Sequence, residues 1–432
     1  MNPLYRNDRP GVAPGSWYAA SLPDAAPRPA IDGDVSADVA IVGAGFTGLW
    51  AALVLARAGR RVTVLDAHRV GFGASGRNGG QVHYGYTKDQ AWLEGRLGPG
   101  AARALWELAE AGKAQLRAFC DEHPETAYRP GIAHGEYHAS DLAALQAEAA
   151  HLAAHYDYAI DVLDAAAFRD LVRTESYLCG TFDAQGGHLH PLAYARALAR
   201  AAEDAGAVIH ELSEVTAIEP GQPVRLVTSR GSVQADHAVV AGNGYLPNIL
   251  APVNARVMPI NSFIAATEPL PDRWQEVLRE DIAVADSRFI VNYFRFTADR
   301  RFLFGGRESF GIGFPRDIAT RLVGRMHAMF PQIKDARVDY VWGGTLGITP
   351  TRLPHVARVG HNILSGAGFS GQGVALSGMV GRVMAEAVMG QQDGLTTLAS
   401  LPVPTFPGGA AFRAPILALA MSWFSLRDRL GF

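Results

Sequence analysis

The chain has 432 residues, 48% of them hydrophobic and 19% charged, which is enough apolar material for the cores of two or three ordinary domains. The formal net charge of -3, the isoelectric point near 6.5 and the lack of any long Lys/Arg run exclude a general electrostatic attraction to nucleic acid or to an anionic membrane. Cys120 and Cys179 form neither a CxxC pair nor a metal-ligand cluster, so buried free thiols, no metal site and a cytoplasmic location are predicted.

Residues 1–37 are predicted to form an irregular arm that lies over the folded body. The segment is dense in Pro and Gly, which interrupt helices and strands. It also lacks the basic stretch followed by an apolar core that a secretory signal requires, so no signal peptide is expected.

Residues 38–67 contain the most informative motif of the chain. A short run of apolar, mostly β-branched residues has the composition of a strand buried in a parallel sheet. In the GxGxxG that follows, Gly43 permits a tight turn, Gly45 lets a pyrophosphate approach the backbone, and Gly48 lets the next helix pack closely. That helix directs its amino end at the phosphates. Asp66, after a second strand, is placed to bind ribose hydroxyls, so the motif predicts a dinucleotide site.

The segment 73–81, GASGRNGGQ, is too rich in glycine for a helix or an ordinary strand. Glycine is needed where another group approaches the backbone closely or where φ is positive. The segment also carries one cation, Arg77, and hydrogen-bonding side chains at Asn78, Gln81 and, just beyond it, His83. We therefore expect this segment to contact a ligand.

Two other stretches have the patterns of a mixed domain. Residues 89–149 predict mainly helix with a strand near 128–138, and residues 251–339 alternate as antiparallel strands do. The aromatic residues of the second stretch are expected to fill a core on one face, so that only the other face lines a pocket. HLHP at 188–191 is interpreted as a helix start rather than a metal site, because no third ligand is evident.

Two strand-and-glycine units occur later in the chain. Residues 236–245 predict a buried strand ending in a glycine turn, and residues 361–386 predict a strand, a glycine-rich loop and a helix. The loop amides could face an electron-rich group such as the pyrimidine side of a reduced flavin. No second GxGxxG follows a strand, as would be expected if the chain also bound a nicotinamide cofactor. These features favour FAD over NAD.

Residues 406–432 are predicted to form an amphipathic C-terminal helix. Its apolar run, 414–424, is about half of the roughly 20 residues that span a bilayer, so no transmembrane segment is expected. Such a helix docks on its own protein, on a partner or, peripherally, on a membrane surface.

Several separated segments resemble the D-amino-acid-oxidase-like superfamily of FAD-dependent oxidoreductases. They are the motif at 38–67, GFGASGRNGGQ at 71–81, the segment 186–218, DHAVVAGNGYL at 236–246 and GAGFSGQGV at 366–374. Shorter similar stretches, SWYAAS near the start and RLPHV near the end, extend the resemblance over nearly the whole chain. Within the superfamily, the pattern is most similar to the bacterial γ-glutamylputrescine oxidases.

The resemblance implies an α/β fold in which a discontinuous, Rossmann-like FAD-binding domain is joined to an α+β substrate domain with an antiparallel sheet over the flavin. The FAD-binding domain is expected to comprise residues 38–88, 150–250 and 340–405. Residues 89–149 and 251–339 are expected to form the substrate domain.

The resemblance also implies noncovalent FAD, because relatives with covalent flavin use a cysteine late in the chain and none follows Cys179. In this family the loop after the second strand passes the flavin, so residues 74–81 are expected beside its ribityl chain and ring, with Arg77 near the pyrophosphate or flavin. The implied cofactor-binding residues are Gly43, Gly45, Phe46, Thr47, Gly48, Asp66, Ala74, Ser75, Arg77, Asn78, Gly79, Gly80, Gln81, Val215, Gly242, Gly368, Phe369, Ser370, Gly371, Gln372 and Gly373.

The implied reaction is oxidation of a C–N bond of a small-molecule amine, such as γ-glutamylputrescine or a related polyamine derivative. The imine hydrolyses to an aldehyde, and O2 is reduced to H2O2. Some relatives use a lysine for the oxygen step, and the scarcity of lysine here leaves open a dehydrogenase with another electron acceptor. The candidate catalytic residues are Arg307, His83, Trp342 and Tyr293.

The segment Trp342–Thr349 bears on the substrate. Several amino-acid oxidases of the superfamily place an Arg here to hold the substrate carboxylate, whereas this chain has Leu346 and Gly347. That departure favours an amine over a simple α-amino acid. Arg307 and Arg352 could still supply a carboxylate site, so the alternative is a secondary or cyclic amino acid such as sarcosine, proline or pipecolate. A flavin-binding subunit for electron transfer or assembly is a further alternative.

Overall fold

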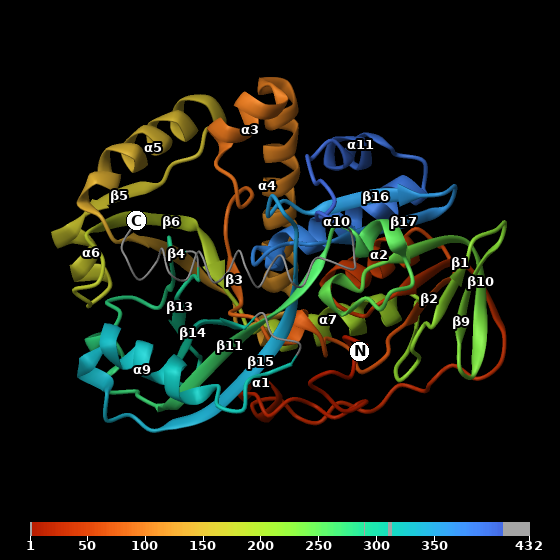
Figure 1. The fold of residues 1–432 in the computed structure, drawn as a ribbon, viewed down its shortest axis with the longest axis horizontal. Helices are drawn as coiled ribbons and strands as arrows, with labels where there is room; N and C mark the ends of the chain where they lie inside the picture. Colours follow the sequence, from red (N-terminus) through yellow and green to blue (C-terminus); the bar gives the residue numbers. More distant parts are fainter. Residues whose placement is uncertain (1, 289, 310–312, 409–432) are drawn as a thin grey trace.

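The computed structural model describes residues 2–288, 290–309 and 313–408, without the side chains of residues 307–309. Within these residues the backbone forms two sheets, one on each side of the view in Figure 1, with helices packed around them. The predicted C-terminal helix at 406–432 lies almost entirely outside the described residues.

The first sheet is built around parallel strands. β1 pairs in parallel with both β2 and β10, β2 with β7, and β10 with β17, whereas β9 and β16 join the sheet antiparallel. The strands in spatial order are β16 (His355–Val359), β17 (Ile363–Ala367), β10 (Gly231–Val240), β1 (Val35–Val42), β2 (Val62–Leu65) and β7 (Val208–His210), with β9 (Val224–Thr228) and β8 (Ala217–Glu219) extending from β10. This parallel centre confirms the expected Rossmann-like architecture.

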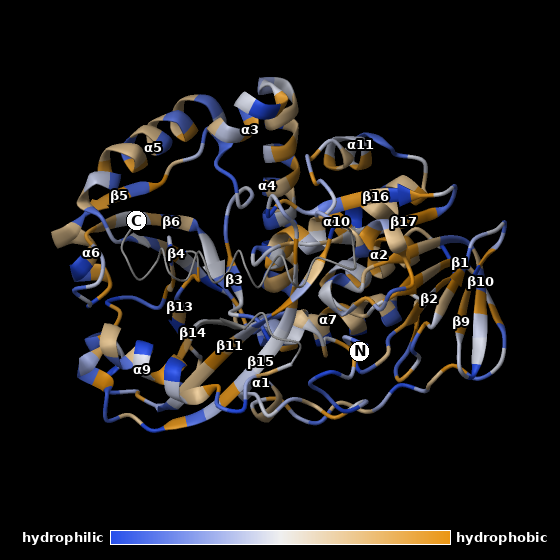
Figure 2. Cartoon of the chain, viewed as in Figure 1, coloured by the Kyte–Doolittle hydropathy of each residue, from blue (hydrophilic) through white to orange (hydrophobic). Residues whose placement is uncertain are grey.

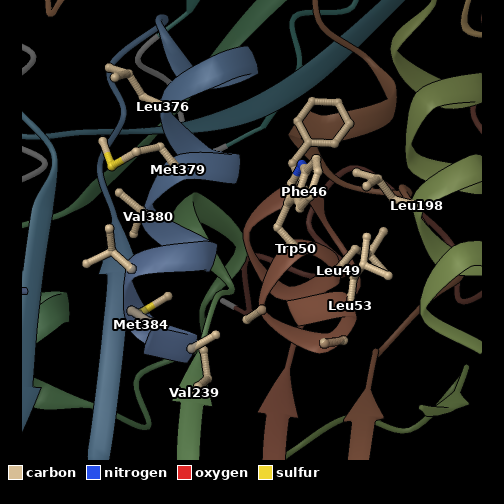
Figure 3. Packing of buried hydrophobic residues seen from close by; sticks show 14 of the residues in the cluster. Phe46, Leu49, Trp50, Leu53, Leu198, Val239, Leu376, Met379, Val380 and Met384 are labelled. Carbon is tan, nitrogen blue, oxygen red and sulfur yellow. The ribbon is translucent and has the colours of Figure 1, made fainter. Parts of the chain in front are cut away.

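Helices close one face of this sheet through an apolar core. They are α2 (Phe46–Arg57), α4 (Pro99–Glu122), α7 (Pro191–Asp204) and α10 (Gly373–Val388). Figure 3 shows α10, which carries Met379, beside α2, which carries Trp50. A Cβ at Gly381 would lie 2.3 Å from the backbone oxygen of Thr47, and one at Gly378 would lie 2.7 Å from the Trp50 ring. Glycine therefore permits the close approach of the two helices, while hydrophobic residues gather on β1, β2 and β10 beside them (Figure 2).

The second sheet is antiparallel apart from the parallel pair β12–β4. Its strands in spatial order are β15 (Val338–Ile348), β11 (Met258–Pro269), β14 (Arg301–Ser309), β13 (Tyr293–Phe296), β12 (Ala283–Asp286), β4 (Arg129–Glu136), β6 (Cys179–His188) and β3 (Gln81–Val82), with β5 (Asp161–Asp164) beside β6. This confirms the mainly antiparallel sheet expected of the second domain.

Alternation along β13 and β14 separates a core from a pocket face. Phe294, Phe296, Phe302 and Phe304 are fully buried in one aromatic cluster, whereas Tyr293 lies on the opposite face of β13. The period of two residues along a strand produces this division, as the sequence predicted.

The sheets divide the chain differently from the domain ranges expected from the sequence. β3, β6 and β15 come from ranges assigned to the FAD-binding domain, yet all three belong to the second sheet. Strand periodicity shows which residues alternate but does not show which sheet a strand joins, since pairing partners are distant in sequence.

The remaining helices lie around the two sheets. They are α1 (Trp17–Ala20), α3 (Gln90–Leu97), α5 (Leu142–Tyr156), α6 (Ala165–Leu171), α8 (Ala251–Asn254), α9 (Ala319–Met329) and α11 (Asp393–Ala399). The HLHP sequence starts α7 as predicted, because His190 Nδ1 accepts a hydrogen bond from Ala193 N. Cys120 and Cys179 are buried free thiols. In the described part of the chain, no helix has both the length and the apolarity that crossing a membrane requires.

Candidate active site

A cavity of about 810 Å³ lies between the carboxyl ends of the parallel strands and the second sheet. Its walls come from the β1–α2 turn, the segment after β2, the end of β10, the end of β15 and the loop before α10. It continues to residues between β12 and β13. Open α/β sheets bind ligands at the carboxyl ends of their strands, and the volume is in the range of cofactor and substrate sites.

The three glycines of the β1–α2 turn meet different neighbours. Gly43 has φ +103°, and a Cβ there would lie 2.9 Å from the oxygen of Ala241. A Cβ at Gly48 would lie 1.9 Å from Gly43 O, so Gly48 serves packing and stays outside the cavity wall. Gly45 lines the cavity, where a Cβ would lie 2.8 Å from Ser75 Oγ. The turn thus presents bare backbone to the cavity, followed by Phe46 and Thr47 in the wall.

Asp66 fixes the turn from the end of β2. Its carboxylate accepts hydrogen bonds of 2.7 Å from Ala44 N and from His68 N. Burial raises the pKa of this carboxyl, and the two amide bonds oppose that rise. Each carboxylate oxygen can accept a further bond, so Asp66 can still receive a hydroxyl from a ligand. Val215 and Gly242 line the cavity as well.

The glycine-rich loop after β2 contributes Ala74, Ser75, Asn78, Gly79 and Gln81 to the wall. Asn78 Nδ2 donates to the backbone oxygens of Ala74 and Ser75, both at 3.0 Å, and Asn78 Oδ1 accepts from Gly80 N at 2.7 Å. The loop is therefore folded onto itself and presents one side to the cavity.

Some glycines in this loop are required because other segments of the protein, rather than a ligand, lie close to the loop backbone. Gly80 has φ +74°, and a Cβ there would lie 2.1 Å from Leu189 O, so Gly80 faces backbone rather than the cavity. A Cβ at Gly79 would lie 2.9 Å from the Tyr293 ring. The sequence pattern predicted that this segment contacts a ligand, whereas neighbouring chain segments account for the missing Cβ at these two positions.

Arg77 is buried and holds three segments together. Nε donates to Phe72 O at 2.7 Å, and Nη1 donates to Asp8 Oδ1 at 3.0 Å and to Gly343 O at 3.2 Å. The guanidinium carbon also lies 4.4 Å from the Phe72 ring centroid. Nη2 is buried without a hydrogen-bond partner in the described structure, and the residue lines the cavity.

The loop before α10 forms the opposite wall with Phe369, Ser370, Gly371, Gln372 and Gly373. α10 begins at Gly373, so its free amino-terminal amides and partial positive charge lie at the cavity. Gly368 stands behind this wall, with φ +78° and its amide donating to Asn243 Oδ1 at 2.8 Å.

Four buried polar atoms on residues of the cavity wall have no hydrogen-bond partner among the described residues. They are Arg77 Nη2, Thr351 Oγ1, Gln372 Oε1 and Ser377 Oγ. Buried polar groups in native proteins are nearly always paired. Donors and acceptors left together in one cavity therefore fit a large polar ligand that satisfies them.

His83 lies at the end of the cavity under the second sheet. Burial, with the neighbouring charges of His134 and Lys113, lowers the pKa of His83 to about 3. His83 is half-buried and lines the cavity. His83 is therefore neutral at physiological pH and offers one donor and one acceptor nitrogen.

Tyr293 and Gln81 complete this end of the cavity. The Tyr293 hydroxyl lies 3.4 Å from Ser262 Oγ, and its ring packs where a Cβ at Gly305 would be only 2.1 Å away. Gln81 Nε2 donates to Val284 O at 2.8 Å. These contacts fix both side chains against the second sheet.

Trp342, another candidate catalytic residue, is not among the described residues that line the cavity. Trp342 is buried behind it, where Nε1 donates to Arg77 O at 3.0 Å and the ring packs edge-on against Tyr18 at 5.3 Å. Trp342 therefore supports the loop instead of facing a ligand. Arg307 lies on β14 opposite Phe263, and its side chain is outside the described part of the structure.

Sequence reasoning did not identify the contribution of the N-terminal arm. Leu4, His68 and Glu214 all line the cavity near its dinucleotide end. Leu4 O lies 2.9 Å from His68 Nε2, and the Tyr5 hydroxyl donates to Glu214 at 2.6 Å. The arm carries no glycine motif or periodicity at these residues, so no local signal could have indicated this.

The family model described as FAD dependent oxidoreductase matches residues 38–387, which include the glycine turn, the loop after β2 and most of α10. The chain belongs to this family. This confirms the resemblance recognised from the sequence. A member of the FAD dependent oxidoreductase family with this cavity is an oxidoreductase for an amine or an amino acid, and FAD is its cofactor.

Two bacterial relatives match almost the whole chain. The probable oxidoreductase OrdL of Rhizobium meliloti (strain 1021) is 38% identical over 97% of this chain and 98% of that protein. The γ-glutamylputrescine oxidoreductase of Escherichia coli (strain K12) is 36% identical over 96% of this chain and 98% of that protein.

Solved structures of the family share the fold at lower identity. Glycine oxidase from Geobacillus kaustophilus has a TM-score of 0.68 and 22% identity, covering 82% of this chain and 95% of that chain. L-proline dehydrogenase from P. horikoshii has a TM-score of 0.69 and 17% identity, covering 84% and 94%. These similarities confirm the fold.

Proposed function

We propose that the chain oxidises the terminal primary amine of γ-glutamylputrescine, or of a closely related N-acylated diamine, with O2 as electron acceptor. The overall reaction is amine + O2 + H2O → aldehyde + NH3 + H2O2. The observation that carries the proposal is the 36% identity to the Escherichia coli γ-glutamylputrescine oxidoreductase over nearly the full length of both chains.

In this proposal, the cofactor lies between the β1–α2 turn and the loop before α10. The amino ends of α2 and α10 both adjoin the cavity and favour negative charge, as on a pyrophosphate or an electron-rich ring. Asp66 accepts from ribose hydroxyls, and the unpaired Arg77 Nη2 and Gln372 Oε1 find their partners on the cofactor. When bound, FAD accepts the hydride equivalent that leaves the amine α-carbon.

His83 and Tyr293 lie where the substrate amine is expected. A reacting amine must be neutral, and a pKa of about 3 keeps the His83 imidazole neutral beside it. A neutral imidazole adds no repulsive charge and accepts a hydrogen bond from the amine. The two rings position the α-carbon and exclude water, so a dedicated base is not required.

The end of β15 supports an amine rather than a simple α-amino acid. Leu346 and Gly347 line the cavity, and β15 places no cationic side chain there. An α-carboxylate would find no partner on this strand.

Anaerobic mixing of the purified holoprotein with candidate substrates tests the proposal. Rapid loss of the oxidised-flavin absorbance with γ-glutamylputrescine, followed by peroxide formation when air is admitted, is the expected result. Bleaching without peroxide would make the chain a dehydrogenase for the same amine. Bleaching only by sarcosine, proline or pipecolate would overturn the proposal. The substrate carboxylate would then need a cationic partner such as Arg352, which also lines the cavity.

A further inference from the structure

The cavity wall includes cationic side chains at half-buried and exposed positions. Arg288 and its neighbour Ser287 line the cavity and are exposed, so they mark its opening. Lys88 and Arg352 also line the cavity, and the hydroxyl of Thr87 donates to Arg352 O at 2.7 Å. The segment that carries Lys88 is thereby fixed to the turn that carries Arg352.

Lys88 and Arg288 are positioned by aromatic rings rather than by carboxylates. Lys88 Nζ lies 5.5 Å from the centroid of the Trp92 ring, and Arg288 Cζ lies 4.2 Å from that of Tyr137. Among the residues that the structure describes, neither cation forms an ion pair. A ring face attracts a cation without cancelling its charge, so both remain able to bind an anion.

The acidic side chain in this part of the wall is already engaged. Asp286 is buried, and its Oδ2 accepts from the hydroxyls of Tyr137 and Tyr177 and from Asn292 Nδ2, at 2.5, 3.2 and 2.6 Å. Its Oδ1 accepts from the amides of Asn292 and Arg288 at 2.9 and 3.3 Å. With both oxygens occupied, Asp286 has little capacity to receive a substrate ammonium group.

The other titratable groups near this wall do not reverse its charge. His134 Nδ1 lies 3.5 Å from Glu136 Oε1, and the Tyr84 hydroxyl donates to Glu148 at 3.2 Å. Of these residues only His134 lines the cavity. Among the described side chains that line the cavity here, Lys88, Arg288 and Arg352 are cationic and Asp286 is anionic, so positive charge is in excess on the wall.

We propose that Lys88 and Arg288 form a subsite for a carboxylate at the far end of the amine substrate. This inference rests on the proposed function and specifies its substrate class as primary amines whose acyl tail bears a carboxylate. The reacting amine lies near His83 while the tail carboxylate reaches the opening. A γ-glutamyl amide carries such a carboxylate, whereas a free diamine carries a second ammonium group that the same cations repel.

Three amines with the same aminobutyl head and different tails test the subsite. N-succinylputrescine has an anionic tail, N-acetylputrescine a neutral tail, and putrescine a cationic end. Steady-state kcat/KM is expected to fall in that order, by roughly threefold to tenfold at each step at low ionic strength, and to converge as salt is added.

Variants locate the effect on the proposed residues. Arg288→Gln and Lys88→Met should each lower the ratio of kcat/KM for the succinyl over the acetyl substrate by roughly threefold to tenfold, mainly through KM. Arg288→Glu should raise the relative rate with putrescine. Lys334→Met and Arg230→Gln, at exposed positions outside the cavity wall, are matched controls that should leave the ratio unchanged.

Equal kcat/KM for the three amines, or a ratio insensitive to Arg288 and Lys88, would overturn the subsite while leaving the amine oxidase intact. Failure of all three amines and of γ-glutamylputrescine to bleach the flavin is a different result, and it would overturn the proposed function and the subsite together.

Discussion

At the scale of single residues, Ser75 and Gly45 lie close together in the cofactor site. Ser75 Oγ accepts a hydrogen bond of 3.0 Å from Phe46 N, the first amide of α2, and a Cβ at Gly45 would lie 2.8 Å from that oxygen. A side chain at Gly45 would therefore both displace the hydroxyl that caps the helix and enter the cavity. Glycine is required at position 45 because the backbone itself is the binding surface.

Gly45→Val is expected to weaken FAD binding and so lower the FAD retained by the protein. Overpacking of this kind costs about 1 to 3 kcal/mol, which corresponds to FAD binding weaker by up to roughly a hundredfold. The ratio of flavin to protein absorbance after gel filtration measures the loss. Gly95→Ala is the control, because a Cβ at Gly95 meets no atom within 4 Å. A Gly45→Val protein that remained fully yellow would contradict the assigned site.

At the scale of elements, the N-terminal arm (red in Figure 1) connects parts that lie far apart in sequence. Tyr18 donates to Asn78 O at 2.8 Å and packs edge-on against Trp342 on β15. Asp8 pairs with Arg77 at 3.0 Å, and both side chains are largely buried. The arm thus supplies the counter-charge for the cation of the glycine-rich loop.

Asp8→Asn is expected to lower the free energy of unfolding by about 3 kcal/mol, because it leaves the buried Arg77 charge uncompensated. Urea unfolding of the holoprotein measures the change. Asp24→Asn, at an exposed position of the same arm, is the matched control and should have little effect. The double variant Asp8→Asn, Arg77→Met should lose much less than the sum of the single variants, and simple additivity would show that the pair is not coupled.

At the scale of the whole molecule, buried histidines are distributed over distant parts of the fold. Burial lowers the pKa of His83 and of His190 to about 3 and that of His355 to about 4. His190 shows the local reason, since its Nδ1 must stay unprotonated to accept from Ala193 N at the start of α7. All three are neutral in the folded protein at neutral pH.

Acid should therefore destabilise the protein before its carboxylates titrate. As pH falls below about 6.5, the unfolded chain binds protons at these histidines while the folded chain does not, so the free energy of unfolding falls. Each histidine contributes a loss of about 1.4 kcal/mol between about pH 7.5 and about pH 5.5.

His190→Asn isolates one of these contributions because asparagine retains a capping oxygen but does not titrate. The loss of stability between the two pH values, measured by urea unfolding, should be smaller in the variant by about 1.4 kcal/mol. An unchanged pH dependence would show that His190 has the same pKa in the folded and the unfolded protein. The carboxyls of Asp66 and Glu110, whose pKa values are raised by burial, act in the opposite direction at lower pH.

Local motifs were predictable because each depends on the chemistry of a few adjacent residues. The turn at Gly43, the acid at Asp66 and the helix start at His190 are determined by backbone conformation and capping over one or two turns of chain. Trp342 was expected to face the substrate and instead lies behind the cavity wall, because the side of β15 that faces the cavity depends on its pairing with β11. The contacts of Asp8 with Arg77 had no signal in the sequence.

The sequence by itself determined the family, the cofactor and the parallel strands around the glycine turn. Those features depend on residue types at short, fixed spacings, which can be recognised in the sequence without knowledge of distant contacts. Only the tertiary structure decided that β3, β6 and β15 join the second sheet, that the arm neutralises Arg77, and that Lys88 and Arg288 line one cavity. These depend on contacts between segments separated by scores to hundreds of residues, and neither strand partners nor charge neighbours over such separations are encoded in local periodicity.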